Sequence, residues 1–339
     1  MKRDITFFYT DSVERQTTRP VAEEAERRGY AVRSTDRLDT PAQIGFFCSH
    51  RPSPRRCRFS AIMLHDLAQR HDMWPHYWKA EPWHEFDVGF LPGPSWAQRW
   101  RASSRQRASR PRRGVFALGW PKADALFSRK DEFQREAAAL RTRLGLRQER
   151  TVLYAPSWEN HGKQDDFVRA LRGLPVNLLL KQAPWSQAYP EVLASIAAMN
   201  ALHAHAGPDV HIVSPEVGIV QCLALADVMV SEESSVLIEA LLLDVPGIAV
   251  MDWLVPDQVP PRVPSVPFDF VTRTEIASLR RTVEEILARL PEARAGLAPL
   301  RAHHFSCLGE SARRIMDVID ACVDGRPSPW PALRPEPAP

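Results

Sequence analysis

Short apolar runs alternate with longer stretches of mixed polarity along most of the chain. Runs such as residues 59–64 and 228–230 are almost uninterrupted in apolar character, which is typical of strands buried on both faces of a parallel sheet. Between such runs, stretches such as residues 131–144 place apolar side chains along one side of a helix, and Gly145 ends that helix. Strands that alternate with helices in this way predict open α/β domains.

The predicted strands are residues 5–9, 30–34, 44–48, 59–64, 86–91, 115–118, 151–154, 176–181, 210–213, 228–230 and 247–251. The predicted helices are residues 19–28, 95–101, 131–144, 165–171, 187–202, 219–225, 236–243, 275–290 and 310–323. They fall into two β/α series joined near residues 145–150, so we expect two Rossmann-like open α/β domains that face a cleft. We place an N-terminal domain in residues 1–147, a C-terminal domain with terminal helices in residues 148–324, and a disordered Pro-rich tail in residues 325–339.

The C-terminal half contains a strand–turn–helix segment, residues 226–251, with the chemistry of a phosphate site. Small hydroxyl residues, among them Ser234 and Ser235, open a helix that is apolar on nearly every side. Glu239 follows Ser235 by one helical turn, so the two share a face. Phosphate binds N–H groups and hydroxyls at a helix start, and a nearby carboxylate accepts hydrogen bonds from a ribose. The segment indicates half of a nucleotide-diphosphate site; the alternative is a capped core helix with one buried, paired glutamate.

In the N-terminal half, His65 and Asp66 follow the predicted strand 59–64. Open parallel sheets bind ligands outside the carboxyl ends of their strands, which makes His65 a candidate for catalysis. The alternative is a core histidine or a structural partner of Asp66.

The next stretch is crowded with aromatic and histidine side chains. They are His71, Trp74, His76, Tyr77, Trp78, Trp83 and His84. Three interpretations are open: a lip for an acceptor or a membrane surface, a metal site of His65, His71 and His76, or a Trp-rich loop packed on the domain. The arginines in residues 99–113 fit either anionic lipid headgroups or a solvated loop.

Composition narrows the function classes. A formal net charge of +3 over 339 residues argues against a dedicated nucleic-acid binder. The five cysteines lie far apart, so they suggest neither a disulfide framework nor a zinc knuckle, and a reducing cytoplasm fits them best. The polar N-terminus does not resemble a signal peptide, and no apolar run reaches the roughly 20 residues of a membrane span. We expect a cytoplasmic protein with only peripheral membrane contact, no metal and no cofactor.

Several motifs occur in the order of one known family. After His65 come Phe-Asp-Val-Gly-Phe from residue 86, Gly-Trp-Pro-Lys-Ala-Asp from residue 119, Leu-Tyr-Ala-Pro-Ser-Trp from residue 153 and Ser-Glu-Glu-Ser-Ser-Val from residue 231. Over roughly residues 60–320 the chain resembles the CDP-glycerol glycerophosphotransferases of teichoic-acid-type polymer synthesis. The catalytic part of that family has the GT-B fold. The resemblance implies a GT-B-like chain with an acceptor-side N-terminal domain and a donor-binding C-terminal domain.

The resemblance implies roles for individual residues, and some positions depart from the family pattern. His65 takes the place of the presumed base, but Asp66 stands where the family has glycine. Lys122 replaces an arginine, and Ala183 stands near the place of a second histidine that is thought to help hold the donor phosphates. The residues implied to bind the donor are Ser234, Ser235, Glu239, Glu233, Lys122, Asp124, Lys181, Pro156 and Ser157.

The implied reaction transfers glycerophosphate, or a related polyol phosphate, from a CDP-activated donor to a hydroxyl of a cell-surface glycan or lipid-linked acceptor. The diphosphate lies on Ser234 and Ser235, and Glu239 binds the ribose. His65, with Asp66 beside it, removes the acceptor proton, the oxygen attacks phosphorus, and CMP leaves. Such a protein would act at the inner face of the cytoplasmic membrane. Two alternatives are open: a GT-B glycosyltransferase that uses a nucleotide sugar in surface polysaccharide synthesis, and a non-catalytic member of a polysaccharide-assembly complex.

Overall fold

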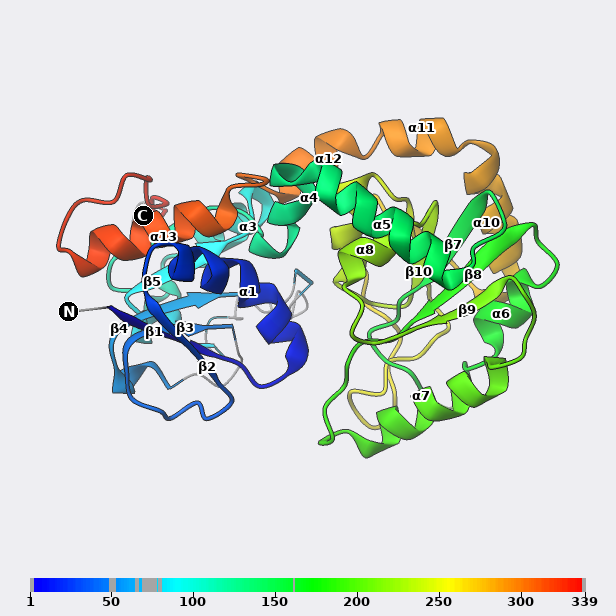
Figure 1. The fold of residues 1–339 in the computed structure, drawn as a ribbon, viewed down its shortest axis with the longest axis horizontal. Coiled ribbons are helices and arrows are strands. Elements are labelled where there is room, and N and C mark those ends of the chain that lie inside the picture. The colour runs from blue at the N-terminus through cyan, green and yellow to red at the C-terminus, as the bar shows by residue number, and fades with distance from the viewer. Residues whose placement is uncertain are drawn as a thin grey trace. The chain divides into compact units, whose positions relative to one another are not determined.

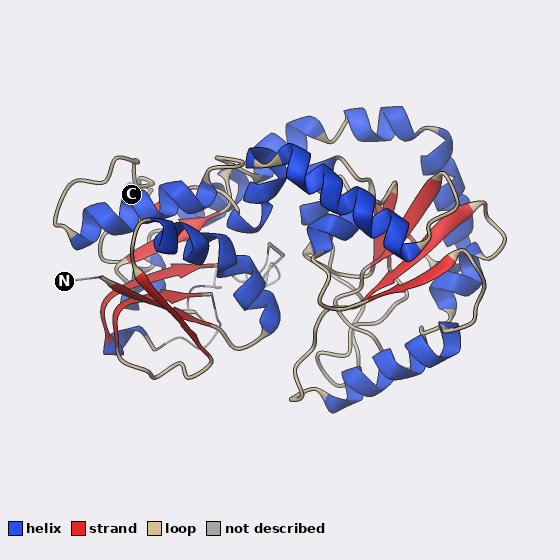
Figure 2. Cartoon of the chain, viewed as in Figure 1, coloured by secondary structure: helices blue, strands red, loops and turns tan. Residues whose placement is uncertain are grey.

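The computed structural model describes residues 3–48, 53–64, 67–68, 78, 81–160 and 162–336. The chain divides into two compact units: residues 1–130 with 302–339 form unit 1, and residues 131–301 form unit 2. Each unit contains one six-stranded sheet of parallel strands with helices around it (Figure 1, Figure 2). The prediction of two Rossmann-like α/β domains is therefore confirmed.

The helices and strands of unit 1 are β1 (Asp4–Phe8), α1 (Ser12–Arg27), β2 (Ala31–Thr35), β3 (Ala42–Phe47), β4 (Cys57–Met63), β5 (Val88–Leu91), α3 (Pro94–Ser103), β6 (Val115–Ala117), α4 (Asp124–Ser128) and α13 (Ser311–Val323). Its short 3-10 helices are η1 (Pro54–Arg56), η3 (Trp83–Glu85), η4 (Arg107–Ser109) and η5 (Pro121–Ala123). The strand order is β2-β1-β3-β4-β5-β6.

Aromatic side chains on both faces of the unit 1 sheet explain its burial. Phe7 and Phe8 are consecutive residues of β1, so their side chains point to opposite faces. Phe7 packs on Phe46 with ring centroids 5.2 Å apart, and Phe8 stacks on Phe47 at 4.3 Å. All four are buried. A continuous apolar run thus marks a strand that is covered on both faces, as predicted.

Helix α13, near the C-terminus, packs against α1 (Figure 1). Arg28 follows the end of α1, and its guanidinium contacts the carboxylates of Asp317 at 2.8 Å and Asp320 at 2.7 Å. The position of α13 in unit 1 differs from the expectation that residues 148–324, terminal helices included, form one domain. Residues 302–324 belong to unit 1 because these ion pairs and the packing on α1 hold the helix there.

Residues 325–336, predicted to be disordered, have defined contacts within unit 1. The backbone N–H of Leu333 donates to the carbonyl of Val115 in the edge strand β6 at 2.7 Å. The guanidinium of Arg314 lies 4.1 Å from the ring centroid of Trp330. The prediction was wrong because a Pro-rich composition does not reveal that one tryptophan of the segment stacks on a cation.

Asp124 connects the Gly-Trp-Pro-Lys-Ala-Asp motif to the start of α13. One of its carboxylate oxygens accepts a hydrogen bond from the N–H of Ser311 at 3.0 Å, and the other from the N–H of Ala312 at 2.7 Å. N–H groups in the first turn of a helix have no partner within the helix. Burial raises the pKa of Asp124, although these N–H groups act to lower it. Both carboxylate oxygens are thus engaged inside unit 1.

The helices and strands of unit 2 are α5 (Lys130–Leu144), β7 (Arg150–Tyr154), α6 (Asp166–Leu171), β8 (Val176–Lys181), α7 (Pro190–His203), β9 (Val210–Val213), α8 (Ile219–Leu223), β10 (Val228–Ser231), α9 (Val236–Glu239), β11 (Gly247–Val250), β12 (Thr272–Thr274), α10 (Leu279–Ala288) and α11 (Leu290–Ala295). The 3-10 helices are η6 (Ala240–Leu243) and η7 (Ile276–Ser278). Helix α12 (Ala298–His304) spans the change from unit 2 to unit 1.

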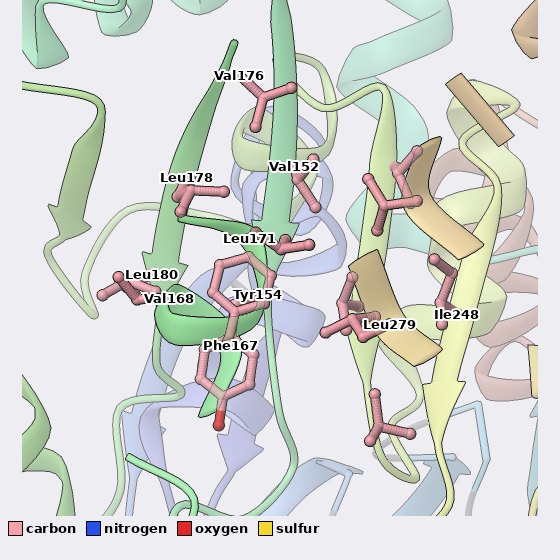
Figure 3. Packing of buried hydrophobic residues seen from close by; sticks show 14 of the residues in the cluster. Val152, Tyr154, Phe167, Val168, Leu171, Val176, Leu178, Leu180, Ile248 and Leu279 are labelled. Carbon is pink, nitrogen blue, oxygen red and sulfur yellow. The ribbon is translucent and has the colours of Figure 1, made fainter. Parts of the chain in front are cut away.

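One face of the unit 2 sheet carries a hydrophobic cluster from β7, β8, β10 and β11 (Figure 3). Alternate residues such as Val152 and Tyr154 point to this face, where Phe167 of α6 and Leu279 of α10 join the cluster. The rings of Tyr154 and Phe167 stack with centroids 5.1 Å apart. Leu153, between the two β7 residues, is also fully buried, so this sheet too is covered on both faces.

The predicted elements differ from the observed ones mainly where helices are short. Residues 176–181 and 210–213 agree with β8 and β9 at both ends. The helix predicted at residues 236–243 consists of one α-helical turn, α9, followed by the 3-10 turn η6, and Asp244 in a left-handed conformation (φ 53°) follows it. Strand β12 and helices α4, α11 and α12 were not predicted, because elements this short carry little periodicity.

Replacing Asp124 with alanine removes the cap of α13 and leaves two buried N–H groups without a partner. We expect the free energy of unfolding to fall by about 1–3 kcal/mol, measured by chemical denaturation followed by circular dichroism. Asp36→Ala, at an exposed position of the same unit, is the control and should change it by less than about 0.5 kcal/mol. Equal stability of the two variants would contradict the capping role.

Candidate functional site

The sheet of unit 2 has a topological switch point between β7 and β10. Its strand order is β12-β11-β10-β7-β8-β9, so the chain leaves β7 toward β8 and β9 and then returns on the other side of β7 as β10. Open α/β sheets bind ligands outside the carboxyl ends of the strands at such a point. Pro156 and Ser157 follow β7 there, and Ser234 and Ser235 follow β10.

A buried glutamate joins the loops that follow these two strands. Glu232 is 0% exposed. One of its carboxylate oxygens accepts a hydrogen bond from the backbone N–H of Trp158 at 2.7 Å, and the other accepts one from the hydroxyl of Ser231 at 3.0 Å. Hydrogen bonds to a charged group are stronger than neutral ones. This contact therefore fixes residues 155–158 against residues 231–235.

The hydroxyl pair lies at the beginning of the short helix α9, as predicted. Ser234 is buried, and its Oγ accepts a hydrogen bond from the N–H of Val236 at 3.2 Å. Ser235 is half-buried, and its carbonyl accepts a hydrogen bond from the N–H of Glu239 at 3.0 Å. The Glu239 side chain is buried one turn further on. Ser235 is thus the hydroxyl residue more open to a ligand, and the roles of all three in donor binding stay predictions.

Two other residues predicted to bind the donor are engaged in contacts within unit 2. The carboxylate of Glu233 forms a two-point ion pair with Arg262, at 2.8 and 2.9 Å, which holds the Pro-rich loop after β11. The ammonium of Lys181 donates to the carbonyls of Gln182 at 2.6 Å and Pro215 at 3.0 Å. Each side chain therefore has a structural role of its own.

The remaining predicted site residues lie in unit 1 or outside the described residues. Lys122 is half-buried in unit 1, where Asp124 caps α13. His65 and Asp66 fall outside the described residues, so their catalytic role stays a prediction. The same holds for the proposed metal ligands and their neighbours: His71, Trp74, His76 and Tyr77.

Two tryptophans considered for a membrane or acceptor lip are in the core of unit 1. Trp78 and Trp83 are fully buried and pack edge to face with ring centroids 4.6 Å apart. For these two residues the packed-loop interpretation is confirmed. In the arginine-rich segment, Arg112 pairs with Asp87 at 3.0 Å. Within the described part of the chain, no helix is long and apolar enough to cross a membrane, and no group of His, Cys, Asp and Glu side chains could hold a metal ion.

A second buried carboxylate, not predicted from the sequence, lies near the first. Glu159 is 1% exposed, and one of its oxygens accepts hydrogen bonds from the Tyr154 hydroxyl at 2.9 Å and from the Gln182 side-chain amide at 2.6 Å. Burial raises the pKa of Glu159, and the charge of Lys163 opposes this only in part. The negative charge of Glu232 raises it further.

Lys163 supplies the positive charge of this buried group. Its ammonium lies 3.7 Å from the carboxylate of Glu232 and 5.4 Å from the ring centroid of Trp253. Nζ has no hydrogen-bond partner among the described residues, so Lys163 acts through its charge and its contact with the aromatic ring. No motif or periodicity marks Lys163 or Glu159 in the sequence, because Glu232, which pairs with Lys163, and Gln182, which donates to Glu159, follow other strands of the sheet.

No protein-family model matches the chain, and no curated protein sequence matches it. Solved structures are similar to it in fold. A variant of the wall teichoic acid polymerase TagF, soaked with CDPG, has a TM-score of 0.69 at 14% sequence identity, and the match covers 95% of this chain and 89% of that chain. A putative UDP-N-acetylglucosamine 2-epimerase from Listeria monocytogenes has a TM-score of 0.65 at 14% identity, with 98% and 100% covered. Anabaena Alr3699/HepE, in complex with UDP and glucose, has a TM-score of 0.53 at 11% identity, with 94% and 100% covered.

The chain has a GT-B-like fold. At sequence identities of 10–15%, the structural likeness shows the fold alone, and the reaction has to be argued from the residues of this chain. The fold class predicted from the apolar runs and the family resemblance is confirmed.

Glu159→Gln should change how stability depends on pH. A pKa raised above its ordinary value of 4.5 means that protonation of Glu159 favours the folded state. That contribution is fully present below the unfolded pKa and is lost as pH rises through the folded pKa. Glutamine is neutral at every pH, so the stability of Glu159→Gln relative to the wild type should increase from about pH 4 to about pH 8.

Denaturant unfolding at several pH values measures this difference. Glu149→Gln, whose side chain is 85% exposed in the wild type, is the matched control and should follow the wild-type curve. Parallel curves for Glu159→Gln and the wild type would show that the carboxyl group of Glu159 titrates normally in the folded protein.

Proposed function

We propose that this protein is a transferase that moves glycerophosphate, or a related polyol phosphate, from a CDP-activated donor to a hydroxyl of a cell-surface glycan or lipid-linked acceptor, with release of CMP. The observation that carries the proposal is the loop after β10. There Ser234 and Ser235 stand at the switch point of a Rossmann-like sheet, fixed to the loop after β7 by Glu232. Such positions suit nucleotide phosphates. The similarity in fold to a TagF structure soaked with CDPG supports the choice of donor.

In this proposal the residues at the start of α9 bind different parts of the donor. Backbone N–H groups and the Ser235 hydroxyl bind the diphosphate, while Ser234 shapes the turn through its bond with Val236. Glu239 accepts hydrogen bonds from the ribose. His65 takes the proton of the acceptor hydroxyl, a new bond forms from that oxygen to phosphorus, and the bond from phosphorus to CMP breaks. Proton removal by a positioned histidine is worth about 10²–10⁴ in rate.

A second candidate, transfer of a sugar from a nucleotide sugar, is favoured by one specific observation. Ala183 stands near the place where the family resemblance implies a histidine that helps hold the donor phosphates, so the donor of this chain need not be that of the family. Among the structures similar in fold, Alr3699/HepE is in complex with UDP and glucose. A non-catalytic role in a polysaccharide-assembly complex is the third possibility, and it requires no nucleotide.

The proposed location of the protein follows from the acceptor. A lipid-linked acceptor would lie at the inner face of the cytoplasmic membrane, and only peripheral contact is needed to reach it. We therefore propose that the protein acts at this face of the membrane.

Release of CMP from CDP-glycerol, measured by chromatography with a lipid-linked glycan as acceptor, tests the proposed reaction. The wild type should release CMP, and His65→Ala should lower turnover by about 100-fold or more with an unchanged melting temperature. His205→Ala, at an exposed position of unit 2, is the control with wild-type turnover. Wild-type-like activity of His65→Ala would remove His65 from the mechanism, and release of a nucleoside diphosphate from a nucleotide sugar would favour the second candidate.

Ser234→Ala combined with Ser235→Ala removes two hydroxyl groups and should weaken CDP binding by about 10- to 100-fold. The loss is limited because the backbone N–H groups of the turn remain in place. Isothermal titration calorimetry measures the dissociation constant. Ser214→Ala, an exposed serine of unit 2, serves as the control and should bind CDP as the wild type does. If the double variant also keeps the wild-type affinity, the diphosphate does not bind at this turn.

A further inference from the structure

Three aromatic side chains form a cluster at the carboxyl ends of β7 and β8. Trp158 and Trp185 each lie four residues after their strand, and their ring centroids are 4.7 Å apart with planes inclined by 50°. Tyr189, the residue before α7, packs edge to face against Trp185 with centroids 4.9 Å apart. Both tryptophans are half-buried, and Tyr189 is 42% exposed. This cluster, called the aromatic platform below, is therefore partly open to solvent.

The aromatic platform is fixed to the candidate phosphate turn within unit 2. The backbone N–H of Trp158 donates to Glu232, which stands two residues before Ser234. Strand β7 lies between β8 and β10, and neighbouring strands are about 4.8 Å apart. The platform and the hydroxyl pair thus flank the carboxyl end of one strand. A ligand whose phosphates bind at Ser234 and Ser235 can extend across that strand end to the platform.

We propose that Trp158, Trp185 and Tyr189 bind the nucleobase of the donor by stacking. The proposal rests on the proposed function and adds to it the subsite for the base. The base is the part of a CDP-polyol that has a π face, because the polyol phosphate has no ring and the ribose is not aromatic. Every base can stack on an aromatic side chain, and loss of one such contact typically weakens binding by about 5- to 150-fold.

The aromatic platform also suggests a role for the turn at Ala183, which positions Trp185. The carbonyl of Ala183 accepts a hydrogen bond from the N–H of Trp185 at 3.0 Å, and this tight turn carries the indole toward Trp158. A histidine near position 183 would add charge or a hydrogen bond at the phosphates, whereas the indole adds stacking area. In this chain a larger share of the donor affinity therefore comes from the base.

Isothermal titration calorimetry on the full chain tests the platform with four probes: CDP, UDP, inorganic pyrophosphate and free glucose. Trp185→Ala and Tyr189→Ala should each lower CDP affinity about 10-fold and leave pyrophosphate affinity unchanged. Trp185→Phe and Tyr189→Phe keep an aromatic ring and should stay within about threefold of the wild type. Leu202→Ala, which truncates a 54% exposed side chain on α7, is the control and should bind every probe as the wild type does.

The outcomes separate the platform from the proposed function. Two results would overturn the stacking role of the platform and leave the proposed function standing. They are equal losses of CDP and pyrophosphate affinity in the alanine variants, or unchanged CDP affinity in both of them. A loss confined to binding of free glucose would show a carbohydrate subsite and would also overturn it. If the wild type binds UDP and not CDP, and the variants lose UDP affinity, the platform holds and the CDP-dependent function fails. A wild type that binds no nucleotide would overturn both.

Discussion

The buried carboxylate of Glu232 is the constraint on which the candidate site depends. An ionised carboxylate removed from water costs several kcal/mol unless it is paired and hydrogen-bonded. Here Lys163 supplies the opposite charge at 3.7 Å, and Trp158 and Ser231 supply the hydrogen bonds. Separating the loops after β7 and β10 would break the bond to Trp158 and leave this charge underpaired. The loops are therefore held in place before a ligand arrives, and a site ordered in advance loses less entropy on binding.

Unit 1 is held together by the same kind of long-range pairing. The chain begins in unit 1, passes into unit 2 near residue 130 and returns after residue 301. On its return, helix α13 is fixed at its first turn by Asp124 and along its length by Arg28, which binds Asp317. Asp124 belongs to a motif that the family resemblance assigns to donor binding. In this structure its two oxygens hold the start of a helix, and its role in donor binding stays a prediction.

The sequence predicted what local patterns determine and failed where distant contacts decide. Buried strands were found because both of their faces are apolar, and the turn at Ser234 was found because cap, helix and strand are contiguous. The start of α1 was predicted too late, at residue 19, whereas Asp11 caps the helix and Pro20 lies inside it. The partner of Lys163 and the unit to which α13 belongs depend on residues far away in the chain, and no pattern along the sequence contains them.

The proposed aromatic platform and a phosphate-binding imidazole would choose the donor in different ways. Charge at the phosphates treats every nucleoside diphosphate alike and is weakened by salt, with a screening length of about 8 Å at physiological ionic strength. Stacking acts on the base, depends little on salt and is the same whatever group the phosphates carry. In the proposal, a site built on Trp158 and Trp185 therefore selects for the presence of a nucleoside and does not recognise the transferred group. Recognition of that group, polyol phosphate or sugar, must then come from side chains other than the platform.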